Sequence, residues 1–167
     1  HPQLAWPISM LRSKAGKDIG YLMPIVDTSL SFTIDYYYDN TLISALNSAD
    51  EAALSYKLEI ARNFASVAED LHKQKHYFVD IKPQNIRVFK GTHLVSFLDC
   101  DGFSISQNGQ RYGAELVSTD YISPEAYRSK MHSSNLGEEQ GRYALAVLFF
   151  QLLNSGTHPF QGIVEND

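Results

Sequence analysis

The sequence contains a single cysteine, Cys100, among its 167 residues. One thiol cannot form a disulfide within the chain, and no group of cysteines and histidines has the spacing of a metal site. This composition excludes the small disulfide-rich secreted proteins. It favours a cytoplasmic protein.

Long hydrophobic runs are also missing. The longest apolar run, residues 144–150, continues to Leu153 after one glutamine, which is far short of the ~20 residues that a membrane helix needs. A positive charge excess is missing as well, because the formal net charge is −5. Nothing in the overall charge favours nucleic acid or an anionic membrane surface. We therefore expect neither as a partner.

The composition that remains, 44% hydrophobic and 20% charged, suits one globular domain or part of one. The pattern predicts an α+β fold that is mainly α. Near the N-terminus, two strands at about 7–11 and 20–24 flank the polar, glycine-containing cluster 13–18, which has the composition of a hairpin turn. The chain starts at His1 without an initiator methionine or the charged start of a signal peptide, so we expect a trimmed or partial chain.

The longest predicted helix begins at residues 48–51, where a Ser and a Glu can form a capping box. Apolar residues then recur at helical spacing as far as about Leu71, and we expect this stripe to be a plain core face. The stripe has one row with Leu54, Leu58, Ala61, Ala65 and Ala68, and a second with Ile60, Phe64, Val67 and Leu71. A shorter helix is predicted at 39–46.

Strand-like segments follow at residues 86–89, 94–98 and 103–106. Residues 107–119 are polar, contain glycine and show no periodicity, which predicts a mobile loop. Ser123 and Pro124 predict the start of a short helix that ends near Arg128. Residues 143–153 are apolar on nearly every side, so we expect a helix there that other elements surround.

Residues 80–85, with the sequence Asp-Ile-Lys-Pro-Gln-Asn, contain groups that phosphoryl transfer needs. The carboxylate of Asp80 can accept a proton from a hydroxyl group, and Lys82 can contact the transferred phosphate. The side chains of Asn85 and Asp99 supply oxygen atoms that can share Mg²⁺. These four residues are therefore the candidate site.

This arrangement resembles the catalytic loop and the metal-binding loop of bacterial serine/threonine protein kinases. The resemblance covers nearly the whole chain and includes residues 123–125 (Ser-Pro-Glu) and 158–160 (His-Pro-Phe). It implies a β-hairpin and interlobe hinge at residues 1–26, as the end of the N-lobe, and a partial C-lobe at 27–167. Within the C-lobe it implies a catalytic loop at 78–85, a metal loop at 99–102, an activation segment at 99–125 and a buried helix at about 141–154.

The resemblance also implies roles for single residues. Asp80 would orient or deprotonate the substrate hydroxyl, and Lys82 would neutralise the moving phosphoryl group of ATP. Asn85 would contact the nucleotide and, with Asp99, would hold Mg²⁺. Asp101 is either a further carboxylate of the metal site or a solvated turn residue.

Met23, Pro24 and Ile25 would form the hinge that binds ATP. Several short segments are similar to a bacterial branch of the family in which some members carry a C-terminal helix-hairpin-helix domain. The implied partners are a protein substrate and, for some relatives, a metal-dependent protein phosphatase.

Several positions depart from the family pattern. Val79 replaces the Arg that pairs with a phosphorylated activation loop in many kinases, and Arg87 replaces the apolar residue under adenine. Gly141 replaces an Asp that holds the catalytic loop, so we expect a less rigid loop, while Ser118 matches the usual Thr of the peptide platform. The chain also lacks the glycine-rich segment, the strand Lys and the helix Glu of the N-lobe.

These absences predict a fragment, with the N-lobe and the last C-lobe helices outside the chain and little activity of its own. Two alternatives to a protein kinase remain. One is a catalytically impaired pseudokinase that acts as a binding scaffold. The other is a small-molecule phosphotransferase of the aminoglycoside type.

Overall fold

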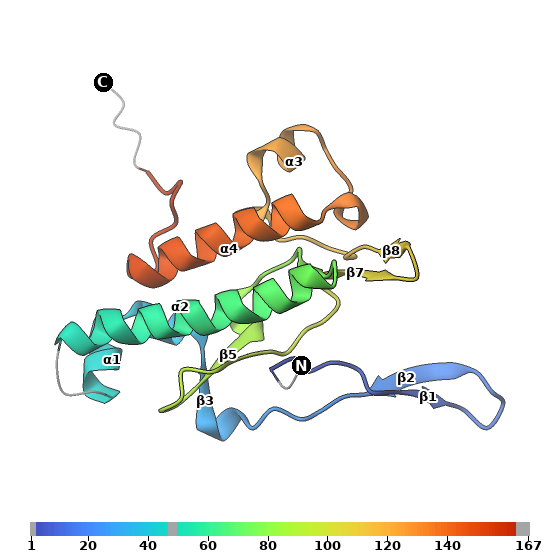
Figure 1. The fold of residues 1–167 in the computed structure, drawn as a ribbon, viewed down its shortest axis with the longest axis horizontal. Coiled ribbons are helices and arrows are strands. Elements are labelled where there is room, and N and C mark those ends of the chain that lie inside the picture. Colours follow the sequence, from blue (N-terminus) through green and yellow to red (C-terminus); the bar gives the residue numbers. More distant parts are fainter. Residues whose placement is uncertain (1–2, 47–49, 163–167) are drawn as a thin grey trace.

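The computed structural model describes residues 3–46 and 50–162, and it combines helices with short strands (Figure 1). The two longest helices, α2 (Asp50–Lys73) and α4 (Glu138–Leu153), pack against each other in the middle of the molecule. The short helix α3 (Pro124–Arg128) lies beyond α4, and α1 (Asn40–Leu46) packs against α2. Among the residues described, short 3-10 helices cover Thr28–Leu30, Ile34–Tyr38, Pro83–Asn85, Thr119–Tyr121 and Ser133–Asn135.

Helix α2 buries only part of the predicted stripe. Ile60 and Phe64 are fully buried in the core. Leu54 and Leu58, in contrast, are 57% and 51% exposed, so the prediction that these two residues face the core is wrong, whereas Ala68 of the same row is buried. Both rows have helical spacing, and the row with the larger aromatic and branched side chains packs against the strands. The predicted capping box lies partly outside the described residues.

Two three-stranded antiparallel sheets lie beside α2 and carry the candidate site. The first has the order β3 (Ser31–Thr33), β5 (Ile86–Phe89) and β6 (Val95–Phe97), and the second has the order β4 (Tyr77–Phe78), β7 (Phe103–Gln107) and β8 (Gln110–Tyr112). Strands β5, β6 and β7 match the predicted segments closely. Strands β3 and β4 were not predicted, because two or three residues are too few to show a period.

The prediction of a mobile loop at 107–119 is wrong at its start. Residues 110–112 form β8, which pairs with β7 so that Gln107 lies opposite Gln110. Asn108 and Gly109 between them both have positive φ, at 52° and 78°, as the commonest two-residue hairpin turn requires. The Asn-Gly pair is the sequence signal that indicates this hairpin. The prediction of a loop missed it because the residues of β8 are polar and show no apolar alternation.

The N-terminal hairpin of β1 (Ser9–Arg12) and β2 (Asp18–Leu22) extends away from the helices (Figure 1). Its second strand begins and ends two residues before the predicted range. Apolar side chains on both strands are exposed, among them those of Ile8 and Ile19.

Helix α4 begins five residues before the range 143–153 that the apolar pattern predicts and three before the range of about 141–154 that the resemblance implies. Its buried side chains include those of Ala144, Leu148 and Leu152. Phe150 and Leu153 are exposed, so within the described residues other elements cover only part of this apolar helix. Between residues 3 and 162, leaving out 47–49, no helix combines the length and apolar character needed to cross a bilayer.

Candidate active site

Asp80 lies two residues after the end of β4 (Tyr77–Phe78), in a short segment that is hydrogen-bonded to the loop at Gly102. The carbonyl oxygen of Gly102 accepts hydrogen bonds from the backbone N–H groups of Val79 and Asp80, both at 2.9 Å. Strand β4 itself pairs with β7, with Phe78 opposite Phe103. The predicted catalytic loop and the predicted metal loop are therefore joined through their backbones.

Both oxygens of the Asp80 carboxylate have partners. Lys82 Nζ lies 2.8 Å from Oδ2, and the backbone N–H of Ser118 donates to Oδ1 at 2.7 Å. The Asp80 side chain is only 7% exposed. The hydrogen bond to Asp80 raises the pKa of Lys82, and the negative charges of Asp80 and Asp99 act in the same direction. The ammonium group therefore stays protonated beside the Asp80 carboxylate.

Asn85 and Asp99 form the second pair of the site, with Asn85 Nδ2 at 3.0 Å from Asp99 Oδ2. A 3-10 helix at Pro83–Asn85 positions Asn85, and Pro83 fits the first turn because it has no N–H to satisfy. The carbonyl oxygen of Asn85 accepts the N–H of Leu98, which brings the residue before Asp99 to the same place. The structure thus brings together all four residues that the sequence singled out for phosphoryl transfer.

Asp101 is exposed, and its backbone N–H donates to Asp99 Oδ1 at 3.1 Å. Among the described residues, no three His, Cys, Asp or Glu side chains gather closely enough to hold a metal ion by themselves. The donor set at this place is instead one amide and one carboxylate, those of Asn85 and Asp99. The role of Asp101 as a metal ligand stays a prediction.

Two of the three predicted hinge residues, Pro24 and Ile25, lie at a different cavity. Pro24 and Ile25 line a mainly apolar cavity with Leu4, Phe89 and Val95, which is separate from the pocket around Asp80. Ile25 is 96% exposed. Contact of Met23, Pro24 and Ile25 with a nucleotide therefore stays a prediction.

Arg87 is half-buried beneath the segment that follows the hinge. Its guanidinium donates to Ser31 Oγ at 3.1 Å, to the carbonyl oxygen of Ser31 and to that of Thr28 at 3.2 Å. A planar guanidinium with five N–H groups suits three acceptors in one loop. The sequence marked this position as unusual but did not indicate these partners.

Gly141 allows α4 to pack directly on β4. A Cβ atom at this position would lie 2.8 Å from the carbonyl oxygen of Phe78, so no larger residue fits without a shift. The N–H groups of Val79 and Asp80, for which Gly141 offers no acceptor, are bound by Gly102. Both of these amides therefore have a hydrogen-bond acceptor, although residue 141 is not an Asp.

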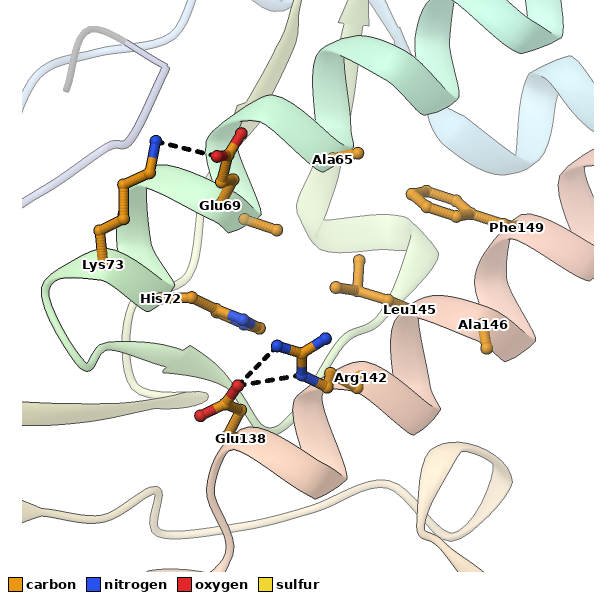
Figure 2. Close-up of a pocket in the computed structure, with 10 residues that line it drawn as sticks. Ala65, Glu69, His72, Lys73, Glu138, Arg142, Leu145, Ala146 and Phe149 are labelled. Atoms are coloured by element: carbon orange, nitrogen blue, oxygen red, sulfur yellow. Dashed lines mark hydrogen bonds and ion pairs between the residues drawn. The ribbon is translucent and has the colours of Figure 1, made fainter.

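A groove between α2 and α4 was not anticipated from the sequence (Figure 2). His72 from α2 points into it toward Arg142, which forms an ion pair of 2.7 Å with Glu138 on α4. Burial lowers the pKa of His72. The groove shares none of its lining with the Asp80 pocket, and its mixture of alanines and charged groups carries no recognisable reaction chemistry.

No protein-family model matches the chain. Over 96% of its length, the chain is 27% identical to a protein named protein kinase YegI from Escherichia coli. It is 28% identical over 83% of its length to 3-phosphoinositide-dependent protein kinase B of Dictyostelium discoideum. It is also 26% identical over 80% of its length to serine/threonine-protein kinase 1 of Orgyia pseudotsugata multicapsid polyhedrosis virus.

The chain spans 24% of the first of these proteins, 15% of the second and 46% of the third. All three are named kinases, and the matches cover most of this chain. The comparisons therefore support a protein-kinase-like family.

Proposed function

We propose that the protein is an ATP- and Mg²⁺-dependent serine/threonine protein kinase, which transfers the γ-phosphoryl group of ATP to a hydroxyl group of a protein. The observation that carries this proposal is the cluster of Asp80, Lys82, Asn85 and Asp99. Since the chain spans only part of each relative, the proposal concerns the full-length protein. In it, residues 3–26 would end the N-lobe and reach the hinge, and residues 27–162 would form part of the C-lobe.

The buried carboxylate of Asp80 is suited to orient a substrate hydroxyl group and to accept its proton. The N–H of Ser118 and the ammonium of Lys82 fix its orientation. Lys82, which keeps its positive charge, also lies where it could neutralise charge on a transferred phosphoryl group. Positioning and charge neutralisation of this kind account for most of catalysis in phosphoryl transfer.

The pair of Asn85 and Asp99 fits Mg²⁺, which usually takes one or two protein oxygens and fills its other positions with water and phosphate. Asp99 is exposed, so it can be reached from solvent. The amide of Asn85 would turn its oxygen toward the ion. Bound there, Mg²⁺ would neutralise negative charge on the phosphates.

A catalytically impaired pseudokinase is the second candidate. The observation that favours it is Arg87, whose guanidinium is held by Thr28 and Ser31 at the position where an apolar residue would face adenine. A scaffold of this kind would fold normally but would not transfer phosphate.

Two variants of the full-length protein test the proposal. Asp80→Asn keeps the shape of the side chain but removes the base, so turnover with ATP and a protein substrate should fall about 100-fold or more, with the KM for ATP little changed. Asp99→Ala should also weaken Mg²⁺-dependent nucleotide binding, seen as a smaller thermal shift with MgATP. Asp18→Asn, in the distant β1–β2 hairpin, is the control.

Full activity of both variants would refute the assigned roles. If the wild-type protein is stabilised by MgATP but transfers no phosphate, the pseudokinase is favoured instead. Mass spectrometry of the phosphorylated product would distinguish a protein acceptor from a small molecule.

A further inference from the structure

Gln140 is a buried polar residue in the first turn of α4, only 2% exposed, and the roles described above do not use it. Its Oε1 accepts a hydrogen bond from the backbone N–H of Ser123 at 2.9 Å. Its Nε2 donates to the carbonyl oxygens of Tyr121 at 2.7 Å and of Val79 at 3.4 Å. One side chain therefore binds the backbones of two segments that are far apart in sequence.

These two segments meet at the candidate site. Val79 is the residue before Asp80, while Tyr121 and Ser123 follow Ser118, whose N–H binds the Asp80 carboxylate. Residues 118–123 are thus attached to the catalytic loop twice, once through Asp80 and once through Gln140. The bond to Asp80 uses the catalytic carboxylate itself, whereas the bonds to Gln140 do not.

The close packing of α4 makes this contact possible. Gly141, the next residue, lets the helix approach the carbonyl oxygen of Phe78, and a Cβ there would be only 2.8 Å from that atom. The approach places the amide of Gln140 within reach of both backbones. A primary amide suits the place because it supplies an acceptor and two donors at once.

We propose that Gln140 is a positioning residue, which holds segment 118–123 against the catalytic loop so that a bound protein substrate presents its hydroxyl group to Asp80. The inference rests on the proposed kinase function and adds a determinant of how the substrate is placed. A displacement of about 1 Å at such a segment is enough to slow a positioned reaction substantially.

Three variants of the full-length protein separate this role from simple packing. Gln140→Met keeps the approximate volume and removes all three hydrogen bonds. Gln140→Glu keeps an acceptor for the N–H of Ser123 and removes both donors. Gln151→Met is the matched control, because Gln151 on the same helix accepts a hydrogen bond from the Tyr121 hydroxyl at 2.7 Å without reaching the catalytic loop.

We expect kcat/KM for a peptide substrate to fall about tenfold or more in Gln140→Met, and at least as much in Gln140→Glu, whose buried carboxylate would face two carbonyl oxygens, with the KM for ATP unchanged in both. Gln151→Met should keep nearly the full value. A loss caused only by unfolding would lower kcat in proportion to the folded fraction and leave both KM values unchanged. That result, or unchanged activity in Gln140→Met, would overturn the proposal.

Hydrogen exchange at the backbone amides of residues 118–123 supplies a measurement that does not depend on turnover. Exchange should be faster in Gln140→Met than in the wild-type protein, while the amides of α2 keep their protection. Unchanged exchange at 118–123 would overturn the role of Gln140 even in an active kinase. Faster exchange in a protein without any transferase activity would instead refute the proposed function and leave the structural attachment intact.

Discussion

Gly102 lies so close to Asp80 that a Cβ atom at Gly102 would be 2.8 Å from the Asp80 carbonyl oxygen and 3.1 Å from its Cβ. The segment after Asp99 is therefore packed directly against the backbone of the candidate catalytic residue. The first distance is shorter than real Cβ atoms show, so any side chain at 102 must displace one of the two loops.

We accordingly expect Gly102→Ala to lower turnover by about tenfold or more, because the displaced Asp80 no longer meets the hydroxyl group correctly. Steady-state kinetics at saturating ATP measures the effect. Gly162→Ala is the control, since a Cβ there meets nothing within 4 Å. Equal turnover in the two variants would show that the loops at Asp80 and Gly102 can move apart without an effect on catalysis, which would contradict this prediction.

Gly141→Ala should destabilise the protein, although alanine is the better helix former. Its Cβ would lie 2.8 Å from the carbonyl oxygen of Phe78, and overpacking of this kind costs typically about 1–3 kcal/mol, against about 1 kcal/mol gained in helix propensity. Urea unfolding followed by circular dichroism measures the change. Arg142→Ala, beside it on the exposed side, should cost about 0.5 kcal/mol or less. An increase in stability for Gly141→Ala would contradict the packing described here.

Cys100 should react slowly with iodoacetamide. Burial, followed by the negative charges of Asp99 and Asp101, raises the pKa of Cys100 to about 11, from an ordinary value of 9.0. Because alkylation requires the thiolate, labelling of the native protein at about pH 8 should be ~100-fold slower than in denaturant. Mass spectrometry of the peptide that contains Cys100 follows the reaction.

The raised pKa of Cys100 also makes the free energy of unfolding depend on pH. A raised pKa means that the fold favours the neutral thiol, so this contribution to stability is fully present below pH 9.0 and is lost as the pH rises toward about 11. The native labelling rate should keep rising over that range. A rate that levels off near pH 9 would contradict the raised pKa, while Asp99→Asn should accelerate labelling.

Arg87→Ala should lower the free energy of unfolding by about 1–3 kcal/mol, because it removes three hydrogen bonds to Thr28 and Ser31. Arg87→Lys should recover only part of the loss, since one ammonium cannot match the guanidinium fork. Arg62→Ala is the control, because Arg62 forms an exposed ion pair with Glu59. Equal stability of Arg87→Ala and Arg62→Ala would contradict the role of Arg87 in holding this segment.

The candidate site could be located from the sequence largely because its residues are close along the chain. Asp80, Lys82 and Asn85 lie within one short loop, and a single strand pair returns the chain to Asp99. Local patterns therefore carried most of the information. The positions of Met23, Pro24 and Ile25 could not be predicted in the same way, because they depend on how a distant segment packs.

The amino-acid sequence by itself determined the long helix α2, the strand pair β5–β6 and the residue types needed for phosphoryl transfer, since periodicity and turn chemistry act over a few residues. Only the tertiary structure decided that Leu54 and Leu58 face away from the core, and that Gln140 joins two distant backbones. The physical reason is that several faces of a helix, or several hydrogen-bond partners of a side chain, are compatible with the same local sequence pattern. Packing between elements selects the one that buries the largest side chains and pairs the buried polar groups.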